Sequence, residues 1–132
     1  MTGKEAKRQL EDYQPKIAEL IRKFFDKEIK SLQKWDPFFL HMLDSAKKQI
    51  LRGGKRIRPI MAIKAYQSVG GKDIREVERT SIGIEIFHTF LLMHDDIIDQ
   101  DDLRHGGRAA HAVYRDFHNN KNFRGESGHF GE

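Results

Sequence analysis

The stretch IGIEIFHTFLLMHDDIIDQDD, at residues 82–102, decides the fold class of this chain. Its first part, residues 82–93, is apolar apart from Gly83, Glu85, His88 and Thr89. This part is too short to cross a bilayer, so no transmembrane segment is predicted. We interpret it as the middle of a helix whose apolar residues point in nearly every direction, which predicts burial all round.

Apolar residues recur at helical spacing through most of the remaining chain. No run of Val, Ile or Thr alternates with period two, so strands have little support and an all-α fold is predicted. Asp36 and Asp73 are placed to cap helices, and Gly53-Gly54 is placed to end one. Five helices are predicted. Four of them cover about 15–32, 37–51, 74–100 and 108–118. The remaining one, the third along the chain, holds Pro59 in its first turn and runs to about residue 69. Residues 119–132 have little periodicity and no clear stop, so the chain is predicted to end inside a loop or just before another element.

The chain has 132 residues, which suits one domain or a piece of one. It contains no cysteine, so disulfides and thiolate metal sites are excluded. Residues 1–72 carry 17 basic against 8 acidic side chains, whereas residues 73–132 carry 7 against 12. This asymmetry disfavours a nucleic-acid module, which would spread basic charge along one face. The first residues, 1–7, lack an apolar stretch, so we expect no secretory signal and a cytoplasmic protein.

Five carboxylates crowd the end of the predicted fourth helix, between Asp95 and Asp102. Asp95 and Asp99 lie one helical turn apart on one face, and His88 falls on nearly the same line. Negative charge is unfavourable at a helix C-terminus, and two carboxylates 6 Å apart repel by roughly 3 kcal/mol at a dielectric of 20. We therefore predict a Mg²⁺ ion that bridges these carboxylates to a phosphate-bearing substrate. The alternative is a solvated acidic helix end.

The second polar motif is GGKRIRP, at residues 53–59. Its glycines let the backbone approach an anion, and the following helix offers its N-terminal N–H groups. Lys55, Arg56 and Arg58 add three positive charges there, although the sequence is not a P-loop. The alternative is a solvated basic turn. Together the two motifs predict a phosphate-bearing substrate between the basic turn and a carboxylate-bound Mg²⁺.

The motif GGKRIRP, followed by HTFLLMHDDIID at residues 88–99 and by Asp102-Leu103-Arg104 with Gly106, resembles the trans-isoprenyl diphosphate synthases, or polyprenyl synthetases. The resemblance implies the N-terminal portion of the isoprenoid synthase helical bundle, which surrounds a deep cavity and is usually a homodimer. It covers nearly all of residues 1–132 but less than half of the family's domain. The second Asp-rich motif of the family is absent.

The activity implied by the resemblance is a prenyltransferase reaction of isoprenoid biosynthesis. Isopentenyl diphosphate joins head to tail with an allylic diphosphate, and pyrophosphate leaves. In this interpretation Asp95 and Asp99 are catalytic and bind the Mg²⁺ that grips the allylic diphosphate. Fixed cations and Mg²⁺ offset the growing charge of the leaving pyrophosphate, and an apolar cavity keeps the carbocation from water.

The resemblance also assigns the substrate-binding residues. Lys55, Arg58 and His88 would hold the diphosphate of isopentenyl diphosphate, and Arg104 would contact the allylic diphosphate. The family usually has a second arginine after Arg104, where this chain has His105. A histidine is only partly charged near neutrality, so this departure implies weaker binding of isopentenyl diphosphate.

Product length in the family depends partly on the residues four and five before the first aspartate, here Leu91 and Phe90. An aromatic residue at this place resembles the geranylgeranyl type, so a short product of about C15–C20 is expected.

Three alternatives differ from an active synthase. Because the second Asp-rich motif is missing, we expect the chain to be inactive by itself, and it is then a partial synthase or a non-catalytic subunit or interaction module. His94-Asp95 also occurs in all-α HD-type phosphohydrolases, but their further ligands have no good candidates here.

The missing half would leave apolar wall uncovered on the fourth helix, which predicts self-association.

Overall fold

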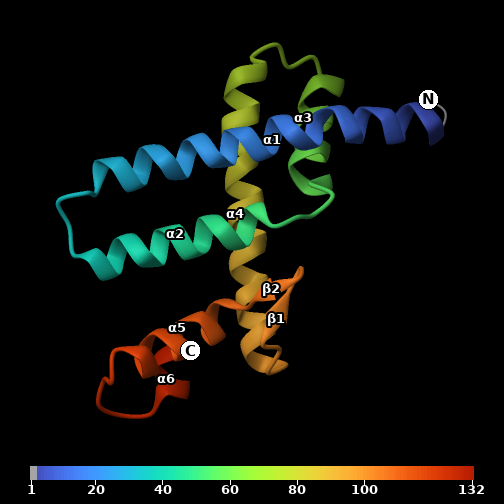
Figure 1. The fold of residues 1–132 in the computed structure, drawn as a ribbon. Helices are drawn as coiled ribbons and strands as arrows, with labels where there is room; N and C mark the ends of the chain where they lie inside the picture. The colour runs from blue at the N-terminus through green and yellow to red at the C-terminus, as the bar shows by residue number, and fades with distance from the viewer. Residues whose placement is uncertain (1–2) are drawn as a thin grey trace.

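The computed structural model describes residues 3–132, which form six α-helices and one two-stranded hairpin. The helices are α1 (Gly3–Ser31), α2 (Pro37–Leu51), α3 (Ile57–Ser68), α4 (Ile74–Ile98), α5 (Ala110–Asn120) and α6 (Ser127–Gly131). The hairpin pairs β1 (Leu103–Arg104) with β2 (Gly107–Arg108) in antiparallel register. Helices α1 and α2 lie side by side, α4 crosses both, and α3 lies along the first half of α4 (Figure 1). The predicted all-α fold is confirmed.

Local capping signals fix where two of the helices begin. The Asp36 carboxylate accepts a hydrogen bond from the Phe38 N–H at 2.7 Å, and Pro37 occupies the first turn of α2. The Asp73 carboxylate accepts one from the Glu76 N–H at 3.0 Å at the start of α4. Both contacts satisfy N–H groups that the helix itself leaves unpaired. The predicted starts of α2 and α4 are therefore confirmed.

The predicted start of the first helix at residue 15 is wrong, because α1 already begins at Gly3 and Pro15 lies inside it. A proline inside a helix removes one hydrogen bond and usually costs about 3 kcal/mol. Tertiary contacts offset this cost. Leu10 and Tyr13 pack against the core, and the Gln14 side chain donates to the Lys55 carbonyl at 3.1 Å.

The chain after α4 contains more regular structure than the sequence predicted. The hairpin turns at His105-Gly106, whose φ angles of 49° and 73° are both positive, as a type I′ turn requires. Residues 119–132, predicted to end inside a loop or just before another element, contain the short helix α6, which packs against α5. A Cβ at Gly131 would lie 2.3 Å from the His111 carbonyl oxygen, so this contact needs glycine.

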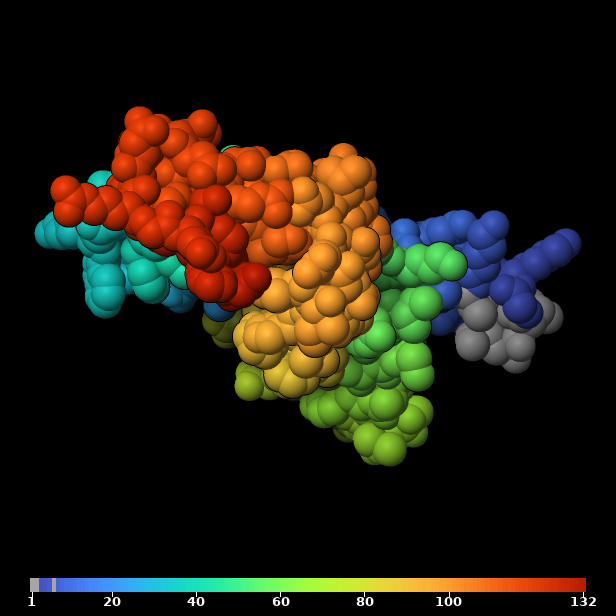
Figure 2. All heavy atoms as spheres, turned by 90° about the horizontal axis from the view of Figure 1, so that it is seen from below, coloured from blue at the N-terminus to red at the C-terminus, as the bar shows by residue number. Residues whose placement is uncertain are grey.

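The core lies where α1, α2, α3 and α4 meet, and it consists of Ile17, Ile21, Phe25, Ile50, Ile60, Ile63 and Ile82. The predicted burial of α4 on all sides is wrong. Phe87 is 61% exposed, and Ile84, Phe90 and Leu91 are also exposed, because the neighbouring helices cover only one side of α4. The second half of α4 and the hairpin reach the surface in the view from below (Figure 2). No helix within residues 3–132 is both long and apolar enough to cross a membrane.

Candidate functional site

A small cavity of about 50 Å³ lies where the turn after α2, the middle of α4 and the hairpin meet. Three of the predicted site residues, His88, Arg104 and His105, line it together with the glycine turn. The full lining consists of Gln49, Ile50, Gly53, Gly54, Arg56, Glu85, His88, Thr89, Leu92, Arg104 and His105. Two histidines and two arginines from distant parts of the sequence therefore converge on the backbone of one glycine turn.

The basic turn divides its three cations between the interior and the surface. Lys55 and Arg58 are exposed, and neither has an ion-pair partner among residues 3–132. The Lys55 backbone is fixed because its carbonyl accepts the Gln14 hydrogen bond. Two uncompensated cations on a fixed turn attract an anion. Both flank the cavity in sequence but do not line it.

Arg56 has a different task, which the sequence did not reveal. Its side chain is buried and its φ of 52° is left-handed. One terminal nitrogen donates to Glu85 Oε1 at 2.6 Å, and the other donates to the Ile50 carbonyl. Arg56 thus joins the end of α2 to α4 and orients the turn that carries Lys55 and Arg58. The available signal was Glu85, a lone carboxylate within an apolar stretch.

Asp95 and Asp99 are exposed at the C-terminal end of α4, where Asp99 is the cap residue. Neither side chain has a hydrogen bond or ion pair within residues 3–132, and no group of three potential metal ligands occurs there. Two free carboxylates one turn apart suit Mg²⁺, which is commonly held by one or two carboxylates, with waters and substrate phosphates completing its shell. The donor set therefore fits this ion.

Asp96, between them, is fully buried. Its Oδ1 accepts hydrogen bonds from Arg104, from Nε at 2.7 Å and from the terminal Nη2. Hydrogen bonding to Asp96 is the main cause that raises the pKa of Arg104. The negative charges of Asp96, Asp101 and Asp95 raise this pKa further. Arg104 thus lies within the field of the aspartate run while lining the cavity.

Asp102 belongs to a separate ion-pair network between the hairpin and α5. Its carboxylate accepts from Arg115 at 2.5 Å, and Arg108 and His111 lie within 3.6 and 3.3 Å of it. The hydrogen bond from Arg115 is the main reason why the pKa of Asp102 lies below its usual value. Arg108 also pairs with Asp116 at 2.7 Å.

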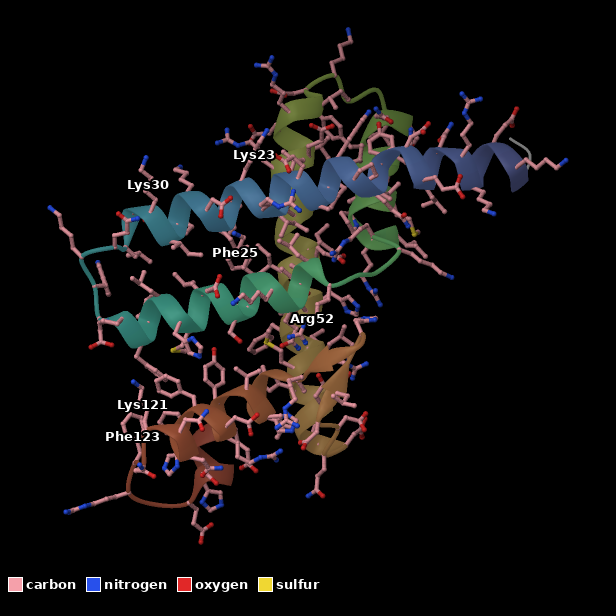
Figure 3. All side chains as sticks on the ribbon, viewed as in Figure 1. Lys23, Phe25, Lys30, Arg52, Lys121 and Phe123 are labelled. Carbon is pink, nitrogen blue, oxygen red and sulfur yellow. The ribbon has the colours of Figure 1, made fainter. Side chains whose placement is uncertain are left out.

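The hairpin is anchored by Arg52, which directly follows α2 and lies above the hairpin in the view of Figure 3. Its Nη1 donates to the Arg108 carbonyl at 2.5 Å. A Cβ at Gly107 would lie 2.5 Å from the Arg52 guanidinium carbon, so glycine permits this close approach. The anchor holds the short hairpin so that Arg104 and His105 line the cavity.

Phe90 and Leu91 lie on the open apolar side of α4 and are about half exposed. The Phe90 ring contacts the His94 ring at a centroid distance of 4.2 Å and stacks on Phe87 at 6.2 Å. The two residues predicted to limit product length therefore form part of an uncovered apolar surface.

The fold and site define an α-helical protein in which a basic glycine turn, a histidine and a hairpin arginine meet beside an aspartate-rich helix end. Residues 41–121 match the model of the polyprenyl synthetase family, so the chain belongs to that family. The family resemblance of the sequence motifs is thereby confirmed.

Two curated relatives support this assignment. The chain is 34% identical over 99 residues to a short chain isoprenyl diphosphate synthase of Methanocaldococcus jannaschii, covering 75% of this chain and 27% of that protein. It is 33% identical over 102 residues to a geranylgeranyl pyrophosphate synthase of Geoglobus acetivorans, covering 74% of this chain and 31% of that one. The chain thus spans about a third or less of the relatives it matches.

A solved structure agrees with the fold. The geranylgeranyl pyrophosphate synthase of Corynebacterium glutamicum superimposes with a TM-score of 0.82 at 27% identity. The match covers 92% of this chain and 36% of that protein, which was crystallised with isoprenyl diphosphate and magnesium. The chain therefore has the fold of part of an isoprenoid synthase bundle.

Proposed function

We propose that the chain supplies diphosphate-binding and Mg²⁺-binding residues of a prenyltransferase that condenses isopentenyl diphosphate with an allylic diphosphate. The observation that carries the proposal is the cavity in which the Gly53-Gly54 turn meets His88 and Arg104. Because the chain spans about a third or less of its relatives, the activity belongs to a complete synthase. We propose that residues 1–132, the first part of the domain without its second Asp-rich motif, do not turn over by themselves.

The basic turn would hold the diphosphate of isopentenyl diphosphate. Lys55 and Arg58 are the exposed cations of the turn, and His88 stands at the cavity beside it. The glycine backbone permits close approach of phosphate oxygens. His105, the turn residue of the hairpin, adds a ring that donates to phosphate in either protonation state.

The aspartate-rich end of α4 would hold the metal, with Asp95 and Asp99 as protein ligands. Mg²⁺, when bound there, offsets negative charge on the departing pyrophosphate. Arg104 adds a fixed positive charge beside Asp95, which would also stabilise the negative charge that develops on the pyrophosphate. The apolar side of α4 that carries Phe87 and Phe90 would keep water from the allylic cation. Phe90 and Leu91 would limit the length of the product to about C15–C20.

Binding of pyrophosphate to the purified chain tests this proposal. We expect Lys55→Gln and Arg58→Gln each to weaken calorimetric binding about tenfold, as loss of one charge-assisted hydrogen bond implies. Lys30→Gln, at the other end of the molecule (Figure 3), serves as the matched control and should bind like the parent. Equal binding by all four proteins would refute the site. Product formation from both diphosphates and Mg²⁺ by the chain alone would refute its proposed inactivity.

A second candidate is a non-catalytic subunit or interaction module derived from a prenyl synthase. The exposed apolar side of α4 favours it, because such a surface needs a covering partner. A homodimer is the form proposed from the family resemblance, and a longer synthase is the other partner. Copurification with a longer synthase would support the subunit, whereas a chain that remains monomeric and unaccompanied would contradict it.

A further inference from the structure

The carboxylates that follow His94 look alike in sequence but differ in their surroundings. Asp95, Asp99 and Asp101 are exposed, whereas Asp96 has no exposed surface. A buried carboxylate is costly unless it is paired and hydrogen-bonded. Asp96 therefore has a task within the protein, which its neighbours do not share.

We propose that Asp96 is a positioning residue that holds the Arg104 guanidinium at the edge of the cavity and does not bind the metal. This inference rests on the proposed function, because it assigns to Arg104 the contact with a diphosphate. Asp96 acts through Arg104 and touches no substrate itself.

The geometry of the pair supports this role. Asp96 Oδ1 accepts from both Nε and Nη2 of Arg104. These two donors lie on one edge of the planar guanidinium, so their bonds fix its plane and direction. The Nη1 group of Arg104 makes no hydrogen bond within residues 3–132 and remains available to donate to an anion. The chain also closes over Asp96, whose carbonyl accepts the Asp101 N–H at 2.9 Å.

The second oxygen of Asp96 shows that stability alone does not explain the pair. Oδ2 is buried and has no hydrogen-bond partner among the described residues. A carboxylate that uses only one oxygen leaves the other at a desolvation cost, so an apolar pair would serve stability at least as well. Such a local cost is typical of residues retained for a site.

The place of Arg104 explains why it needs a fixed direction. Its side chain is 26% exposed, it lines the cavity with His88, and it lies in the field of Asp95 and Asp101. A free arginine next to those exposed carboxylates would turn toward them. Asp96 holds it instead from the buried side, so that it meets a diphosphate without first losing side-chain freedom.

Pyrophosphate binding measured with and without Mg²⁺ separates this role from metal binding. We expect Asp96→Asn and Arg104→Gln each to weaken Mg²⁺-free binding about tenfold, and the double variant to bind no more weakly than Arg104→Gln alone. Asp95→Asn is the matched control, because it removes a proposed metal ligand one residue away. It should lose the gain in affinity that Mg²⁺ provides, whereas Asp96→Asn should keep that gain.

Two outcomes of the binding measurements on the asparagine and double variants would overturn the inference. The first is an additive loss in the double variant, and the second is an Asp96→Asn variant that loses the Mg²⁺ gain as Asp95→Asn does. If Asp96→Asn does not fold by circular dichroism, Arg104→Lys replaces it, since lysine keeps the charge without the two-donor edge. If the Arg104→Lys variant binds pyrophosphate as tightly as the parent does, the inference is also overturned.

An NMR measurement without ligand keeps this inference distinct from the proposed function. The Nε–H of Arg104 should give a slowly exchanging signal in the parent that is lost in the asparagine variant. If that signal is present but the parent does not bind pyrophosphate, the proposed function fails while the positioning of Arg104 stands. If the signal exchanges as fast as that of an exposed arginine such as Arg75, the positioning itself is refuted.

Discussion

The buried ion pair between Arg56 and Glu85 should be the most sensitive single contact of the fold. Only 5% and 7% of the two side chains are exposed, and their charged atoms are 2.6 Å apart. Glu85→Gln tests the pair with little change in shape, since it removes the negative charge and leaves Arg56 buried. The remaining partner is the Ile50 carbonyl, which carries no charge to offset the guanidinium.

The expected loss follows from the burial of the pair. Charges about 4 Å apart attract by about 4 kcal/mol at an effective dielectric of 20, and removing one partner of a buried pair costs about 3–5 kcal/mol. The whole stability of a domain is about 5–15 kcal/mol. Glu85→Gln should therefore remove a large part of the free energy of unfolding and lower Tm by roughly 10–20 °C.

Urea unfolding followed by circular dichroism measures this loss. Glu19→Gln is the matched control, because Glu19 pairs with Arg22 at 2.5 Å with both side chains about half exposed. Its loss should stay below about 1 kcal/mol. The double variant Arg56→Met with Glu85→Gln should be more stable than the sum of the two single losses implies, because no buried charge remains.

The reasoning would be refuted by a loss below about 1 kcal/mol for Glu85→Gln. Additive losses in the cycle would refute it as well, since they would mean that the two side chains contribute independently. A stable but altered turn would instead appear as weaker pyrophosphate binding with an unchanged unfolding midpoint.

Three further changes test other parts of the structure. Gly83→Ala should stabilise α4 by about 1 kcal/mol in thermal unfolding, since a Cβ there meets nothing within 4 Å. Gly71→Ala should instead lower the stability of the fold, since its Cβ would lie 2.3 Å from a tyrosine ring of α3. Equal effects would contradict the packing. Asp102 has a folded pKa below 3.8, so its carboxylate contributes stability above that pH and loses it as pH falls through the folded value. Asp102→Asn should thus unfold earlier than the parent near neutrality but not at about pH 2, and a constant difference would refute the pairing. Phe87→Gln should reduce self-association in light scattering more than Met61→Gln does, although both side chains are more than half exposed, and equal reduction would contradict an interface on α4.

The parts of the fold that the sequence predicted well depend on neighbours within a few residues. Asp36 and Asp73 cap helices through N–H groups two or three residues ahead, so their effect is visible in sequence. The first half of α1 depends instead on Lys55, which is 41 residues from its partner Gln14. The hairpin depends on a left-handed backbone at His105, and a His-Gly pair is not among the usual sequence signals of a type I′ turn, which are Asn-Gly, Asp-Gly and Gly-Gly.

The polar site shows the same limit in its charges. Asp95 and Asp96 are adjacent and identical, and Lys55 and Arg56 are adjacent cations, so charge alone does not distinguish the two members of either pair. Burial separates them, because one member of each pair is enclosed and bonded to another helix or to the hairpin. The motif spacing predicts where charge gathers, whereas the tertiary packing decides which charges face a ligand.

The uncovered side of α4 follows from the same separation between pattern and packing. A segment that is apolar in every direction predicts burial all round, and the pattern does not specify which chain covers each side. Within residues 3–132, α1, α2 and α3 cover the side that holds Ile82, and Phe87 and Leu91 face outward. The matched synthase structure is nearly three times as long as the aligned region, so that protein has further chain that can cover the corresponding side, which stays exposed within residues 3–132. Self-association of residues 1–132 would be expected to cover this side by pairing the exposed apolar residues of two copies.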